Sequence, residues 1–154
     1  MRKRSKYKPR AVLANPVAWV LEGMTPVAQH DSYLIDLKIK NHGAMAALTQ
    51  GRATRIELDA LIAMSNVIEA LWTLGFGTEY EDVIVAGQAA LIEVGRRGLT
   101  TGKFILRAPE MTALNELMEL HDAQMDVITI RDMDRALAVV NKRVKAGKVQ
   151  RITA

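Results

Sequence analysis

The chain has no cysteine, few aromatic residues and no long apolar run, and each absence excludes a class of structure. Without cysteine there is no disulfide, no thiolate metal ligand and no cysteine nucleophile. Aromatic residues are 5% of the 154 residues, so aliphatic side chains and the eight methionines must build the core. No apolar run approaches the ~20 residues that a membrane-spanning helix needs. We therefore expect a cytoplasmic protein without a membrane segment.

Basic residues are concentrated at the two ends of the chain. Residues 1–10 carry a net charge of +6 and residues 142–154 a net charge of +5, with no acid in either stretch. The segment between them carries −7. An acidic body with basic ends predicts that the ends make any contact with a polyanion. We expect a flexible basic arm over 1–10, one helical domain over 11–147 and a basic tail over 148–154.

The strongest local pattern predicts a helix from Thr54 to about residue 74. Thr54 and Glu57 have capping-box spacing, in which the hydroxyl and the carboxylate satisfy backbone N–H groups of the first turn. Apolar residues then recur at steps of three and four, and Gly75 and Gly77 favour a left-handed end. So apolar a helix must be covered by other helices, and we expect it at the centre of the fold.

Residues 32–50 have two interpretations. From Ile35 to Lys40 apolar and polar residues alternate, which is typical of a strand. No second run alternates convincingly, and a lone strand leaves its backbone groups without partners. We therefore predict a helix over 32–50, with any break near Gly43.

Capping residues and prolines indicate the starts of further helices. Thr78 and Glu81 repeat the capping-box spacing, and the glycine-rich stretch from Gly95 to Gly102 is expected to end the helix that follows them. The last helix is expected to bury Leu137 and Val144 among other apolar residues. The predicted helices are 15–23, one from 78 into the glycine-rich stretch, 108–128 and 129–147. Five or six helices joined by short loops predict an all-α, single-domain bundle.

The glycine-rich stretch does not have the spacing of a phosphate-binding loop. Such a loop needs four residues between its glycines and a Ser or Thr after the Lys. Here three residues separate Gly98 from Gly102, and Phe104 follows Lys103. A turn or close helix packing is the better interpretation. Its basic side chains are expected to form a cationic patch: Arg96, Arg97, Lys103 and Arg107.

The polar residues do not form a recognisable catalytic or metal site. Glu119, Asp122 and Asp126 share one helical face, and His121 lies about 100° from Asp122. Helical carboxylate metal sites instead place a His three residues after a Glu on two helices. There is also no nucleophile with a recognisable base. We expect no enzyme, no metal site and no cofactor.

Glu69 is the one charged residue in the most apolar part of the central helix, and two interpretations remain open. Glu69 and Asn66 are three residues apart, so both can lie on the solvent-exposed face, which we prefer. Alternatively, Glu69 makes a buried polar contact that fixes how two helices pack.

Four stretches resemble a known group of sequences: MRKRSKYKPR, IKNHGAMAALTQGRATR, GRRGLTTGKFIL and ELHDAQMDVIT. They are similar to small proteins encoded by tailed phages and prophages of proteobacteria, a family without an established activity. The resemblance covers most of the chain. It implies an accessory protein in the host cytoplasm that binds host proteins or nucleic acid, and it implies no functional residue.

We expect a non-enzymatic interaction protein that self-associates and whose basic termini contact nucleic acid or an acidic partner. The arm can alternatively dock on a neighbouring subunit. The second hypothesis is an inhibitor or modulator of a host protein that acts through a helical face and binds no nucleic acid. The residues expected to contact nucleic acid lie in the arm and in the glycine-rich stretch: Arg2, Lys3, Arg4, Lys6, Lys8, Arg10, Arg96, Arg97 and Lys103.

Overall fold

A computed structural model describes residue 21, residues 23–29 and residues 31–154. The basic arm and most of the helix expected over 15–23 lie outside these residues. The described part of the chain is all-α, as predicted, with five α-helices, two short 3-10 helices and no strand. The elements are η1 (Val27–Gln29), α2 (Asp31–Thr49), α3 (Arg55–Thr73), η2 (Thr78–Tyr80), α4 (Glu81–Thr101), α5 (Ala108–Val127) and α6 (Ile130–Lys145). None of the described helices is long and apolar enough to cross a membrane.

The helix α3 lies at the centre of the fold, as the sequence predicts. The Thr54 side chain accepts a hydrogen bond from the backbone of the first turn, and Glu57 Oε2 accepts one from the Thr54 N–H at 2.7 Å. Gly75 and Gly77 follow the helix with φ of 102° and 77°, which only glycine adopts easily. The helix packs against α2, α4, α5 and α6. Its burial on several sides explains why its sequence is so apolar.

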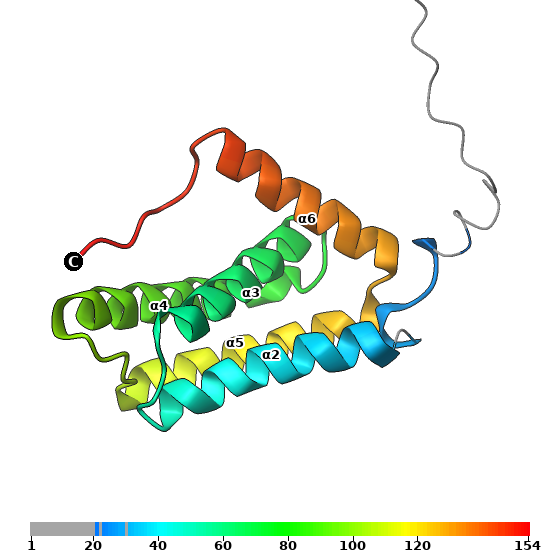
Figure 1. Cartoon of the computed structure of the whole chain (residues 1–154). Coiled ribbons are helices and arrows are strands. Elements are labelled where there is room, and N and C mark those ends of the chain that lie inside the picture. The colour runs from blue at the N-terminus through cyan, green and yellow to red at the C-terminus, as the bar shows by residue number, and fades with distance from the viewer. Residues whose placement is uncertain (1–20, 22, 30) are drawn as a thin grey trace, which may run out of the picture.

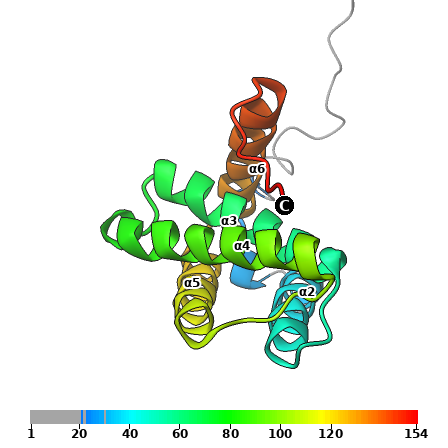
Figure 2. The ribbon, with the colours of Figure 1, turned by 90° about the vertical axis from the view of Figure 1, so that its left-hand side faces the viewer.

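The helices form layers around α3. The helices α2 and α5 lie side by side beneath α3 and α4, and α6 lies on the far side of α3 (Figures 1 and 2). The main apolar cluster fills the space between the two lower layers and includes Leu48, Leu61, Ile68 and Leu117. A second cluster lies beneath α6 and joins α3, α5 and α6 around Leu71. The scarcity of aromatic residues is therefore matched by a core of aliphatic side chains and methionine.

The boundaries of two helices differ from the prediction. The helix α2 runs without a break through Gly43, because nothing in the packing requires a bend there. The helix α4 begins at Glu81 instead of Thr78, and it has no side-chain cap. Residues 78–80 form η2, where the Thr78 carbonyl accepts a hydrogen bond from Trp72 Nε1 at 3.2 Å. The second capping box is therefore absent.

The helix α4 ends within the glycine-rich stretch, as predicted, but only at its last glycine, after Thr101. Gly95 and Gly98 are buried inside the helix, where they allow other groups to approach closely. A Cβ on Gly98 would lie 2.1 Å from the Phe104 ring, and one on Gly95 would lie 2.9 Å from Ile152 Cγ2. Gly102, with φ of 73°, ends the helix.

The last helix, α6, is less buried than predicted. Met133 is buried, but Leu137 and Val144 are 41% and 54% exposed. The reason is that α6 packs chiefly on α3, at the edge of the bundle, and has no described helix on its outer side.

Candidate binding cavity between α3, α4, α6 and the tail

The tail, residues 148–154, lies back over the bundle. After α6 ends, Gly147 takes a left-handed conformation with φ of 68°, and the chain reverses toward α3 and α4 (Figure 1). Ile152 is half-buried, and its side chain occupies the space left by Gly95, beside Leu58. Gly95, which lies in the stretch expected to end α4, therefore gives the tail a place to pack through Ile152.

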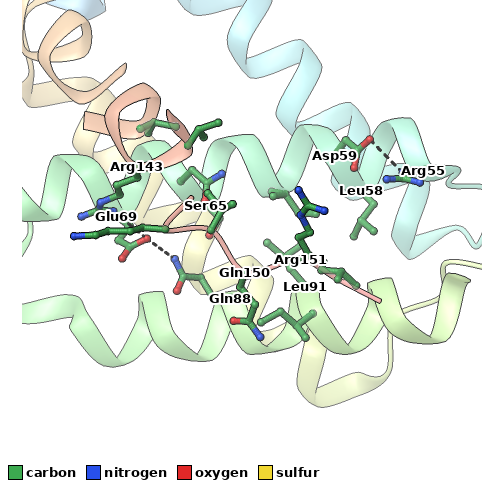
Figure 3. Close-up of a pocket in the computed structure, with 18 of the residues that line it drawn as sticks. Arg55, Leu58, Asp59, Ser65, Glu69, Gln88, Leu91, Arg143, Gln150 and Arg151 are labelled. Carbon is green, nitrogen blue, oxygen red and sulfur yellow. Dashed lines mark hydrogen bonds and ion pairs between the residues drawn. The ribbon is translucent and has the colours of Figure 1, made fainter. Parts of the chain in front are cut away.

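A cavity of about 770 Å³ lies between α3, α4, α6 and the tail (Figure 3). This volume is within the ~300–1,000 Å³ that is usual for small-molecule sites. Each of the three helices contributes at least two aliphatic side chains to its walls, and α4 also contributes Leu99. The others are Leu58 and Ile62 of α3, Leu91 and Ile92 of α4, and Val140 and Val144 of α6.

A polar group at one end of the cavity joins the three helices. Glu69 Oε2 accepts a hydrogen bond from Gln88 Nε2 at 3.0 Å and forms an ion pair with the Arg143 guanidinium at 3.3 Å. The same guanidinium donates to Thr73 Oγ1 at 3.1 Å. The Glu69 side chain is 36% exposed, so it is neither on a fully exposed face nor in a buried contact, and it combines partial exposure with polar contacts to two helices. Its partners belong to α4 and α6.

Ser65 lies one helical turn before Glu69 and also lines the cavity. The residue is only 2% exposed, and its Oγ has no hydrogen-bond partner among the described residues. A buried polar group without a partner costs about 1–3 kcal/mol, so such groups call for an explanation. The Ser65 hydroxyl could act both as a donor and as an acceptor toward a group that reaches it from the cavity.

The charges around the cavity do not balance. Asp59 is 3.7 Å from Arg55, and Glu69 is paired with Arg143, so both carboxylates that line the cavity have a cationic partner. Two further cations line it, both in the tail: Lys148 and Arg151. Neither side chain forms an ion pair or hydrogen bond with any residue that the structure describes. Arg151 lies between the Arg55 pair and the Glu69 group (Figure 3).

The basic residues expected in the glycine-rich stretch have different environments. Arg97 donates to both carboxylate oxygens of Glu110, at 3.0 and 2.5 Å, and to the Ile105 carbonyl at 2.8 Å. Arg96 is exposed and pairs with Glu93 at 3.1 Å, and Lys103 is exposed. Arg97 is therefore held inside the fold, between α4 and the start of α5. The six cations of the arm lie outside the described residues.

The pair formed by Arg97 and Glu110 shifts both pKa values. Hydrogen bonding to the carboxylate raises the pKa of Arg97 further above its ordinary value. Burial acts to raise the pKa of Glu110, but hydrogen bonds from Arg97 and from the Arg107 N–H lower it below 4.5 overall. The Glu110 carboxylate therefore stays charged at neutral pH, and its ion pair with Arg97 holds the start of α5 against α4.

Two polar pairs connect α2 with α5, and the sequence did not reveal them. Asn41 Nδ2 donates to His121 Nε2 at 3.2 Å, and His42 Nε2 donates to Asp122 Oδ2 at 3.0 Å. Burial lowers the pKa of His121 to about 4, so the ring is neutral at pH 7. The partners are 80 residues apart, and no local spacing indicates such a pairing. Within the described residues, no group of His, Asp and Glu side chains has the arrangement of a metal site.

No family model, no curated protein and no solved structure matches this chain. We therefore infer function from the contacts, the cavity and the charges of the described residues.

Proposed function

We propose that the chain is a non-enzymatic, phage-type accessory protein of the host cytoplasm that self-associates and whose basic ends contact nucleic acid or an acidic partner. The observation that carries this proposal is the unbalanced charge of the last 13 residues. Four of their five cations are exposed, and their side chains form no ion pair or hydrogen bond within the described part of the chain: Lys142, Lys145, Lys148 and Arg151.

The chemistry of these four residues suits a polyanion. Lysine side chains on an exposed, flexible stem contact phosphate as point charges, and each contact releases condensed counterions. The arm over 1–10 has no acidic residue and adds six cations at the other end of the chain. Nucleic acid is the partner that we put first, because it accepts such contacts without requiring a shaped surface.

The proposal is tested by fluorescence anisotropy of labelled duplex DNA across a salt series. We expect micromolar binding whose logarithm falls linearly with the logarithm of salt concentration. Replacing Lys142 and Lys145 by Gln should reduce that slope by about 2, since each lost phosphate contact removes about 0.9. The matched control replaces Lys38 and Lys40, which are on α2, and should leave the slope unchanged.

A second variant tests the arm in the full chain. Replacing its six cations by Gln should weaken binding and reduce the slope further, because these residues are proposed phosphate contacts. No binding by the unaltered chain at low salt would overturn the nucleic-acid proposal. A pull-down from host lysate with and without nuclease then separates the alternatives: a protein that persists after nuclease indicates an acidic partner protein.

Self-association is supported by an apolar face on α2. Ile35 and Ile39 are one turn apart and are 54% and 67% exposed. Gly43, a further turn along, has nothing within 4 Å of where its Cβ would be, so this face is also smooth enough for another helix to approach. We place a second copy of the chain on this face. A host protein that is bound and inhibited through the same face is the alternative.

A further inference from the structure

We propose that the cavity under the tail binds an elongated amphipathic anion, of the class of medium-chain carboxylates, and that the tail closes over it. This site goes beyond the proposed contact with nucleic acid and does not depend on it. Three independent features carry it: the shape and apolar walls of the cavity, the unpartnered Ser65 hydroxyl, and the two unpaired cations of the tail.

The shape suits an extended molecule. Arg55 and Glu69 lie at opposite ends of the cavity, and both belong to α3 (Figure 3). Their spacing of 14 positions corresponds to about 21 Å along a helix. About half of the lining residues are aliphatic and the others are polar or charged, which suits a ligand with both an apolar and a polar part. An alkyl chain can lie along this length, and a compact polar ligand would leave much of the apolar wall in contact with water.

The polar groups define the head of the ligand. Ser65 Oγ is buried, lines the cavity and has no partner in the described structure, so a ligand oxygen would satisfy it. Lys148 and Arg151 give the lining two positive charges that no carboxylate of the lining balances. A negatively charged head satisfies all three groups together, because a carboxylate accepts several hydrogen bonds and pairs with cations.

The tail covers one side of the cavity and carries the two cations that would bind the anionic head. Ile152 is seated against Gly95 and Leu58, and it fixes the tail beyond the two cations. The turn at Gly147 lets the tail leave and return without altering α6. A ligand can therefore enter when the Ile152 side chain loses its contacts with Gly95 and Leu58. A bound anion should hold the tail in place through Lys148 and Arg151.

The first experiment titrates the full chain with octanoate and, in parallel, with octan-1-ol, followed by NMR chemical shifts. We expect saturable 1:1 binding of octanoate with Kd below about 1 mM. Octan-1-ol should bind at least fivefold more weakly because it cannot pair with the two cations. Equal affinities for the acid and the alcohol would overturn the anionic part of the proposal, and no saturable binding of either would overturn the site.

Variants assign the binding to this cavity. Ser65→Ala should weaken octanoate binding about fivefold while leaving the melting temperature unchanged or higher, since it removes a buried hydroxyl without a partner. Replacing Lys148 and Arg151 by Gln should weaken it about tenfold, and the matched control with Lys40 and Lys103 replaced should not. Unchanged affinity in both cavity variants would overturn the proposal.

A blocking variant gives an independent readout. Ile62→Phe should fill part of the cavity and abolish binding, and Ile92→Phe is the second choice if the first variant does not fold. Sedimentation with anionic lipid vesicles distinguishes a free acid from the acyl chain of a lipid. Vesicle binding that Ile62→Phe abolishes indicates a lipid chain, and octanoate binding without sedimentation indicates a free acid. DNA binding by Ile62→Phe should be unchanged, which separates failure of this site from failure of the proposed function.

Discussion

At the scale of single residues, burial decides what a polar side chain can do. Four polar residues are buried among the described residues: Asn41, Ser65, His121 and Gln124. Gln124 Nε2 donates to the carbonyls of Ile68 and Phe76 and so supports the end of α3. Ser65 Oγ, Gln124 Oε1 and His121 Nδ1 have no hydrogen-bond partner among the described residues, but of these three residues only Ser65 lines the cavity, which is why it points to a ligand.

We predict that His121 makes the fold less stable in mild acid. Its folded pKa is about 4, below the ordinary value of 6.5, so the unfolded chain takes up the proton first. The stability that depends on the neutral ring is full above about pH 6.5 and falls as the pH decreases toward 4. The loss across this window should be about 3 kcal/mol, from a shift of about 2.5 pH units. Urea unfolding between pH 7.5 and 4.5 measures it.

A variant separates this effect from the titration of carboxylates. His121→Gln keeps an acceptor for Asn41 and removes the titrating ring, so its stability should depend less on pH between 6.5 and 4. The charged groups that face the ring, His42, Lys38 and Asp122, are present in both proteins and cancel in the comparison. The same pH dependence in the two proteins would contradict the assignment to His121.

At the scale of elements, capping residues indicated the starts of α3 and α6 correctly, but the same spacing at Thr78 and Glu81 forms no cap. The caps of α3 and α6 are formed by residues three positions apart, Thr54 with Glu57 and Thr129 with Asp132, and both are present. Of the glycines predicted to end α4, only Gly102 does so, because Gly95 and Gly98 lie inside the helix and face Ile152 and Phe104. A buried glycine and a terminating glycine look alike until the neighbouring element is known.

We predict that the adjacent residues Arg96 and Arg97 differ sharply in their effect on stability. Arg97→Gln should lower the free energy of unfolding by about 2 kcal/mol, because it leaves the shielded Glu110 carboxylate without its cationic partner. Arg96→Gln removes only an exposed pair with Glu93 and should cost less than about 0.5 kcal/mol. Chemical denaturation of the two variants, which have the same net charge, tests this. Equal losses of unfolding free energy in the two variants would show that the ion pair of Arg97 does not stabilise the packing of α5 on α4.

At the scale of the whole molecule, the sequence predicted the all-α class and the central helix but not the cavity. Apolar periodicity and caps are properties of neighbouring residues, and they were enough for α3. The cavity combines Ser65 with Gln88 and Arg143, which come from three helices and have no common motif. Only the folded topology brings them together, so Glu69 could be recognised as unusual from the sequence, while its partners could not.

The last prediction concerns self-association through α2. We expect the mass in solution to exceed the 17.0 kDa of one chain at high micromolar concentration, as measured by light scattering or sedimentation. Ile39→Glu should shift the protein to monomer, because a charge buried between two copies costs several kcal/mol. Val85→Glu on α4 is the matched control: Val85 is 59% exposed, close to the 67% of Ile39, and its replacement should leave the oligomer intact.

The possible results of this experiment separate the two partners proposed for the α2 face. An oligomer that Ile39→Glu dissociates supports a second copy on this face. An oligomer that persists in both Ile35→Glu and Ile39→Glu assigns the contact to another surface. A clean monomer of the unaltered chain overturns self-association, and the exposed isoleucines then favour a host protein, since two such residues one turn apart are the usual pattern of a helix that docks in a groove. Cross-linking of the monomer in host lysate, compared with Ile39→Glu, would then identify that partner.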